Sequence, residues 1–143
     1  MTTTRQQLDA IIEWLATHIS DPQMLQHSVR VADRFRDRYD TWLVALLHDV
    51  VEDGVSDMDT VKSVFKLSDA QVSVLEALTR RSTDETYMDY IERVSHNPVA
   101  VEIKLSDLTD NIRRCAADLP TYHQLLPRYA KAYSRLVSIN KPK

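Results

Sequence analysis

The chain has a single glycine, Gly54, in 143 residues, and this feature limits its fold more than any other. Few glycines and few clusters of turn residues favour an all-helical chain. A P-loop needs glycines around its lysine, and a Rossmann turn needs three. Both are excluded, so a nucleotide bound by this chain is not held by a glycine-rich loop.

Apolar residues recur at helical spacing along most of the chain. With Pro, Ser, Asp and Asn as boundary signals, they predict an all-α bundle of about seven or eight helices. The expected ranges are about 5–19, 22–38 and 42–52, a short helix capped by Ser56 or Asp57 that includes residues 61–65, one from 68 to 78, one around 86–94, one from 98 to 116, and a last helix from 119. Pro127 is expected to kink this last helix or shift its start. Core candidates in the second range are Met24, Val29, Val31, Ala32 and Phe35.

Bulk properties predict one domain over residues 1–143. The chain is 43% hydrophobic and 27% charged, as in ordinary globular proteins. Its net charge of −3 argues against a general nucleic-acid binder, which needs a basic surface. No stretch reaches the roughly 18 apolar residues of a membrane span. Cys115 is the only cysteine and the first residues carry no apolar signal segment, so we expect a cytoplasmic protein.

The segment 44–54 places ionisable side chains in an apolar helical run. His48 and Glu52 are one helical turn apart, as are Asp49 and Asp53. Buried charges are costly unless they are paired or bound to a metal. Acidic residues at a helix C-terminus are also disfavoured without a compensating cation. The segment therefore predicts a polar site at the end of a buried helix.

Two other parts of the chain can complete this site. His27 lies upstream among apolar residues, and the segment 104–111 downstream carries Asp107 and Asp110. Two imidazoles and two carboxylates suit a divalent cation such as Mn, Fe or Zn. Asp107 fits better, because Asp110 lies about 60° off the line through Lys104 and Asn111. The alternative is that this stripe is a solvated salt-bridge face.

The combined pattern resembles a known enzyme group. His27, His48-Asp49 and Asp107 resemble the metal set of the HD-domain phosphohydrolase superfamily. More narrowly, His48-Asp49-x-x-Glu52-Asp53 with Lys104-x-x-Asp107-x-x-x-Asn111 is similar to the hydrolase domain of the RelA/SpoT family and its small stand-alone alarmone hydrolases. Members of that family are all-helical. They remove the 3′-pyrophosphate from guanosine tetra- or pentaphosphate, the nucleotides of the stringent response, usually with manganese.

The resemblance implies a role for each matching residue. It makes His27, His48, Asp49 and Asp107 metal ligands, most naturally for Mn²⁺, with Fe²⁺, Zn²⁺ or Mg²⁺ as alternatives. Glu52 and Asp53 match the acidic pair that positions or activates the attacking water. Asn111 matches a residue that contacts the ribose region, and Lys104 matches one near the substrate.

A strongly anionic substrate also needs cations along its approach. Arg30, Arg80 and Arg81 are candidates, and Tyr87 could donate a hydrogen bond or stack on a base. The alternatives are a solvated loop for the arginine pair and core packing for the tyrosine. One departure from the family is the stretch 14–22, which lacks the Arg or Lys that packs on guanine in typical members.

We therefore expect a metal-dependent hydrolase that releases pyrophosphate from a (p)ppGpp-like nucleotide. Its partner would be a small anionic nucleotide, with no role for nucleic acid or membrane. One alternative is an HD-type phosphohydrolase acting on another nucleotide, such as a 5′-mono- or triphosphate. The other is a metal- or nucleotide-binding module without turnover.

Overall fold

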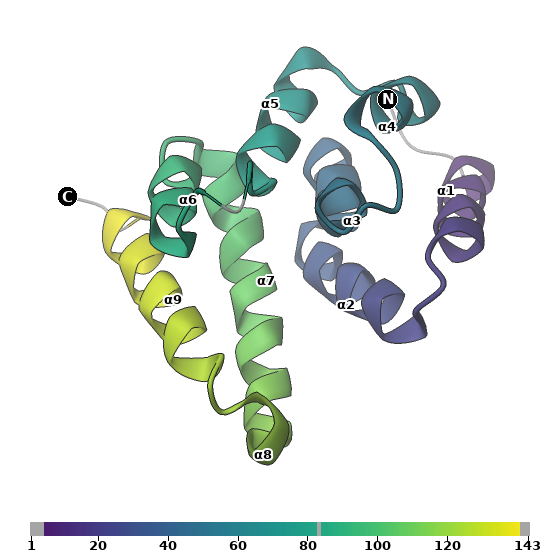
Figure 1. Cartoon of the computed structure of the whole chain (residues 1–143). Helices are drawn as coiled ribbons and strands as arrows, with labels where there is room; N and C mark the ends of the chain where they lie inside the picture. Colours follow the sequence, from purple (N-terminus) through teal and green to yellow (C-terminus); the bar gives the residue numbers. More distant parts are fainter. Residues whose placement is uncertain (1–4, 83, 141–143) are drawn as a thin grey trace. The chain divides into compact units, whose positions relative to one another are not determined.

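The computed structural model describes residues 5–82 and 84–140, and their regular structure is entirely helical (Figure 1). This confirms the all-α class. The described part contains nine α-helices, four of them before residue 66, and one short 3₁₀ helix. The sequence predicted seven or eight helices. The described part has more because the segment predicted as one last helix forms two, α8 and α9.

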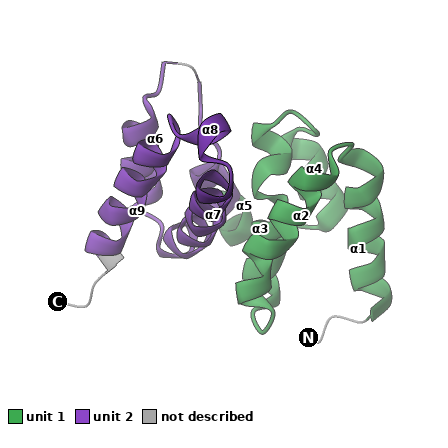
Figure 2. Ribbon diagram, turned by 90° about the horizontal axis from the view of Figure 1, so that it is seen from below, with its two compact units in different colours: residues 1–73 green, residues 74–143 purple. Residues whose placement is uncertain are grey.

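The chain divides into two compact units, Met1–Ser73 and Val74–Lys143 (Figure 2). The first contains α1 (Arg5–His18), α2 (Pro22–Ala32), η1 (Asp33–Phe35), α3 (Tyr39–Glu52), α4 (Met58–Phe65) and the start of α5 (Asp69–Leu78). The second contains the rest of α5, α6 (Tyr87–Val94), α7 (Pro98–Ala117), α8 (Leu119–Tyr122) and α9 (Leu126–Asn140). The single domain expected over residues 1–143 stays a prediction.

Helix α2 begins where the sequence indicates and ends earlier than predicted. The Asp21 side chain caps its start by accepting a hydrogen bond from the Gln23 N–H at 3.0 Å. The predicted extension to residue 38 is wrong: the chain tightens into the 3₁₀ helix after Ala32 and turns into α3. The following segment is charged and exposed except for Phe35, so little apolar burial holds it helical. Val29 is also not a core residue, since 41% of it is exposed.

Helix α3 is the most buried helix of the first unit, with eight of its fourteen residues buried. It packs against α2. Gly54 ends it with a φ of +74°, a left-handed conformation that glycine adopts without strain. The N–H groups of Gly54 and Val55 donate to the carbonyls of Val51 and Val50. The only glycine of the chain therefore closes the helix that carries the predicted polar site.

Helix α7 is the longest described helix, with 20 residues, and it packs mainly against α9 within the second unit. Asn97 caps its start by accepting hydrogen bonds from the N–H groups of Val99 and Ala100. The predicted last helix is instead α8 and α9, and Pro127 lies in the first turn of α9. Proline fits there because the first helical N–H groups have no partner within a helix.

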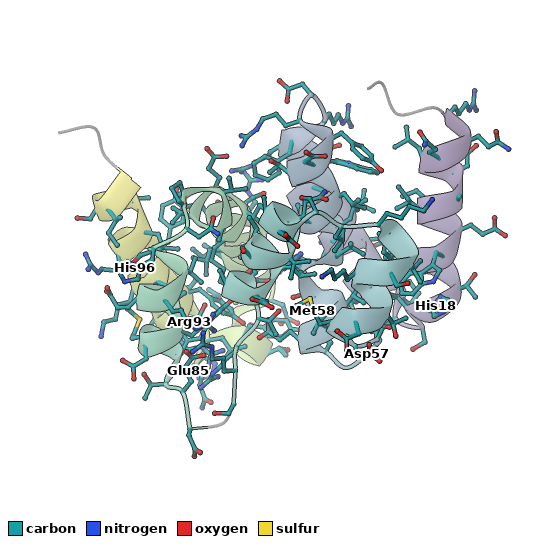
Figure 3. All side chains as sticks on the ribbon, turned by 90° about the horizontal axis from the view of Figure 1, so that it is seen from above. His18, Asp57, Met58, Glu85, Arg93 and His96 are labelled. Atoms are coloured by element: carbon teal, nitrogen blue, oxygen red, sulfur yellow. The ribbon has the colours of Figure 1, made fainter. Side chains whose placement is uncertain are left out.

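The loop between α5 and α6 is held by ion pairing and hydrogen bonds. Arg93 donates to both carboxylate oxygens of Glu85, at 2.9 and 3.0 Å (Figure 3). It also donates to the carbonyls of Glu76 and Ala77 in the last turn of α5 and to that of Thr79 just after the helix. Arg93 therefore ties the end of α5 to the loop that precedes α6.

Candidate metal centre

The two histidines of the predicted site come from neighbouring helices of the first unit. His27 lies on α2 and His48 on α3, and each is about 97% buried, with 3% and 2% of the residue exposed. Their ring centroids are 5.4 Å apart. The sequence places both residues on apolar helix faces, and packing of α2 against α3 brings them together.

A backbone carbonyl fixes the tautomer of His48. Its Nδ1 lies 2.6 Å from the carbonyl oxygen of Ala45, one turn earlier in α3. A carbonyl oxygen can only accept, so Nδ1 must carry the hydrogen. In the neutral ring this leaves the Nε2 lone pair unprotonated. That arrangement orients metal-bound histidines in proteins.

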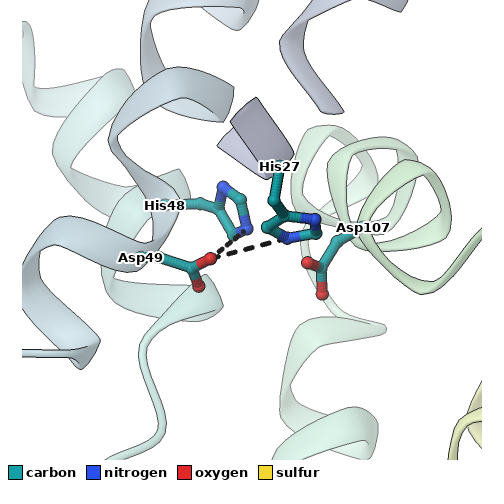
Figure 4. A group of neighbouring side chains, drawn as sticks. All are labelled: His27, His48, Asp49 and Asp107. Atoms are coloured by element: carbon teal, nitrogen blue, oxygen red, sulfur yellow. Dashed lines mark ion pairs between the residues drawn. The ribbon is translucent and has the colours of Figure 1, made fainter. Parts of the chain in front are cut away.

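Asp49 faces both imidazoles with the same carboxylate oxygen. Its Oδ2 lies 3.1 Å from Nε2 of His48 and 3.5 Å from Nε2 of His27 (Figure 4). A lone pair on His48 Nε2 directed at a carboxylate oxygen is repulsive unless a cation lies between them. The cation can be a proton or a metal ion. The donor set of these three residues therefore fits a divalent metal.

Asp107 is buried on α7, with 3% of the residue exposed. The ammonium of Lys104, one turn earlier, lies 2.7 Å from its Oδ2. Asn111, one turn later, donates to its Oδ1 at 3.5 Å. Burial is the largest single effect and lowers the pKa of Lys104, but the charge of Asp107, the nearby Tyr90 and Tyr87, and the hydrogen bond to Asp107 together raise this pKa well above its usual value. Lys104 is therefore charged and orients the Asp107 carboxylate.

His27, His48, Asp49 and Asp107 form a group that could hold a metal ion. Each offers one ligand atom, and these four atoms lie within 4.8 Å of one another. Two imidazole nitrogens and two carboxylates suit a divalent first-row metal. Of the two downstream candidates, the group contains Asp107, which the helical spacing favoured over Asp110.

The acidic pair predicted beside the metal lies at the end of α3. Glu52 is the last residue of the helix and Asp53 is its C-cap, and both are exposed. The Asp53 N–H donates to the Asp49 carbonyl at 2.9 Å. The pair thus directly follows the turn that carries His48 and Asp49, at the solvent-exposed end of the helix. Their predicted role in activating water stays a prediction.

The predicted substrate cations have varied surroundings. Arg30 is exposed on α2. Arg80 is half-buried and donates through Nε and Nη2 to the Glu85 carbonyl at 3.0 and 2.7 Å. Arg81 is exposed, and its N–H donates to the Glu85 carboxylate. Tyr87 is half-buried at the start of α6.

Two features of the second unit were not predicted from the sequence. The first is a pocket of about 70 Å³ at Asn111, lined also by Arg114, Cys115, Tyr122, Leu125 and Tyr129. The second is Arg128, whose guanidinium lies over the ring of Tyr87. The contact of Arg128 with Tyr87 and the lining of the pocket depend on how α6, α7, α8 and α9 pack, which helical spacing within one segment does not reveal.

Comparison of the chain with protein-family models and with curated protein sequences found no match. Within the described residues, no helix is both long enough and apolar enough to span a membrane.

Proposed function

We propose that this protein is a metal-dependent phosphohydrolase that removes pyrophosphate from a 3′-pyrophosphorylated nucleotide of the (p)ppGpp type. The observation that carries the proposal is the shared contact of His27 and His48 with one oxygen of Asp49. A buried polar cluster of this kind is costly unless a cation completes it. The resemblance to the RelA/SpoT hydrolase domain supports the choice of reaction.

His27, His48, Asp49 and Asp107 are the residues that would hold the metal. A bound divalent cation would lower the pKa of a nearby water molecule and neutralise charge at the phosphorus centre. The Ala45 carbonyl keeps the His48 ring in the tautomer that this role needs. Lys104 and Asn111 each donate a hydrogen bond to the Asp107 carboxylate and orient it.

Glu52 or Asp53 would act as the general base. Both follow the metal-binding residues of α3 within one turn, and both are exposed to solvent. In the proposed reaction, water adds to the phosphorus next to the 3′-oxygen and the bond to that oxygen breaks. The products are a 3′-hydroxyl and pyrophosphate: the base accepts a proton from the attacking water, and this proton is returned to the departing 3′-oxygen.

The substrate class is supported by Asn111, the residue whose family counterpart contacts the ribose region. Asn111 contacts Asp107 and lines the pocket of the second unit. A pocket beside a candidate metal ligand can take part of a small ligand. Arg30, Arg80, Arg81, Lys104 and Tyr87 remain the candidates for contacts with the rest of the nucleotide.

Another nucleotide substrate is the second candidate, and the stretch 14–22 favours it. This stretch has no Arg or Lys for packing on guanine, and its Trp14 ring stacks on His18 with centroids 3.9 Å apart. A cation stacked on a base contributes about 0.5–2 kcal/mol. Without this cation, we expect the ratio of kcat/KM for the guanine substrate to that for the adenine substrate to be roughly 2- to 30-fold smaller than in typical family members.

A nucleotide panel assayed with added Mn²⁺ tests the proposal. The full chain is offered 3′-pyrophosphorylated guanine and adenine nucleotides and ordinary 5′-nucleotides, and phosphate and pyrophosphate release are measured. We expect pyrophosphate from the 3′-pyrophosphorylated forms, and none from the matched His48→Gln variant. Activity on 5′-nucleotides alone would support the second candidate. Metal binding without turnover of any nucleotide would identify a binding module.

A further inference from the structure

Arg128, in the first turn of α9, is an exposed arginine held by aromatic rings. Its guanidinium carbon lies 4.2 Å from the ring centroid of Tyr87 and 5.5 Å from that of Tyr129. No carboxylate of residues 5–82 or 84–140 pairs with it. The rings attract the cation and fix its place, while its N–H groups keep their capacity to donate.

The hydroxyl of Tyr87 is a donor without an acceptor. It is excluded from solvent and has no hydrogen-bond partner in the described part of the chain. Burial raises the pKa of Tyr87, so the hydroxyl keeps its proton at neutral pH. An unsatisfied buried polar group is costly and therefore needs an explanation. A ligand oxygen that accepts from this hydroxyl would remove the cost.

A second cation and a pocket lie near this pair. The Lys104 ammonium lies 6.0 Å from the centroid of the Tyr87 ring and is bonded to Asp107. Tyr129, which Arg128 contacts, also lines the 70 Å³ pocket. That volume exceeds the roughly 10–15 Å³ that one water needs. The pocket is therefore lined both by Tyr129, which contacts Arg128, and by Asn111, which contacts Asp107.

We propose that Arg128 and Tyr87 form an oxyanion-binding pair that takes a phosphate group of the substrate. The planar guanidinium offers two parallel N–H donors to a phosphate, and the phenol offers a third donor. The inference rests on the proposed function for the identity of the substrate, but the anion-binding pair can be tested by itself.

The direct test uses titration calorimetry in EDTA to measure the binding of inorganic pyrophosphate to the metal-free full chain. We expect Arg128→Ala to weaken binding about 10-fold or more, since a hydrogen bond to a charged group is lost. Tyr87→Phe should weaken it about 3- to 10-fold. Arg128→Lys keeps the charge without the fork and should fall between wild type and Arg128→Ala. Arg113→Ala, an exposed arginine on α7, is the matched control and should bind as wild type.

The outcomes separate this inference from the proposed function. If the wild type cleaves a nucleotide, Arg128→Ala and Tyr87→Phe should raise KM with unchanged metal content. If no nucleotide is cleaved but pyrophosphate binding depends on both residues, the anion-binding pair stands and the phosphohydrolase fails. The inference is overturned if wild type does not bind pyrophosphate, if both variants bind as wild type, or if Arg113→Ala loses as much affinity.

Discussion

Replacement of Glu85 by glutamine should destabilise the second unit in a pH-dependent way. The Glu85 carboxylate accepts two hydrogen bonds from Arg93 and one, at 3.0 Å, from the Arg81 N–H. These interactions, with the Arg93 hydrogen bonds the largest, lower the pKa of Glu85 from 4.5 to about 2. Arg81 donates to Glu85, and α6 begins just after Glu85. Because both parts carry residues predicted to bind substrate, the substitution also tests how these residues are held in place.

The magnitude follows from the pKa. A pKa lowered from 4.5 to about 2 corresponds to at most about 3.4 kcal/mol, at about 1.36 kcal/mol per pH unit. The side chains of Glu85 and Arg93 are 15% and 19% exposed, so solvent screening reduces this ceiling. We expect Glu85→Gln to lower the free energy of unfolding by about 1–3 kcal/mol at pH 7.

The pH dependence has a definite sign. Since the folded pKa lies below the unfolded one, the stabilisation is complete above about pH 4.5 and is lost as the pH falls toward 2. The difference between wild type and Glu85→Gln should therefore shrink by about half by pH 3. Urea unfolding followed by circular dichroism between pH 7 and pH 3 measures it.

The matched control is Glu76→Gln, which changes an exposed carboxylate at the end of α5. It should alter stability by less than about 0.5 kcal/mol, as is usual for surface substitutions. A Glu85→Gln variant as stable as the wild type at pH 7 would refute the reasoning, and so would a difference that does not change with pH.

Two further predictions concern the metal centre. His48→Gln and Asp107→Asn should each weaken Mn²⁺ binding by at least about 100-fold, because losing a direct ligand should exceed the 10- to 100-fold effect of losing a residue that only supports a ligand. Elemental analysis and calorimetry measure this, with His123→Ala as an exposed control. Wild-type metal content in both variants would exclude the ligand set. Glu52→Gln and Asp53→Asn should keep the metal, and the one that removes the general base should lose about 100-fold or more in kcat. Full turnover in both would remove the acidic pair from the mechanism.

Much of the fold was predictable because helix boundaries depend on local chemistry. Asp21-Pro22 and Asn97-Pro98 start α2 and α7 through caps that any helix with these residues would form. Gly54 ends α3 because it alone takes a positive φ without strain. The end of α2 was not predictable in the same way, because burial of Phe35 and the turn into α3 decide where the helix stops.

The candidate metal centre was also predictable from the sequence only in part. The sequence by itself determined that His48 and Asp49 are neighbours on one helix, and that Lys104, Asp107 and Asn111 share a stripe, because helical periodicity fixes these relations. Only the tertiary structure decided that His27 on α2 shares an oxygen of Asp49 with His48.

The same holds for Arg128 and Tyr87, which lie on different helices and 41 positions apart. No periodicity within one segment relates residues on separate helices. Their contact arises from the packing of α6, α7 and α9, which depends on how whole apolar faces fit together. Local spacing therefore determined which side chains could share a site, and packing between helices decided which of them meet.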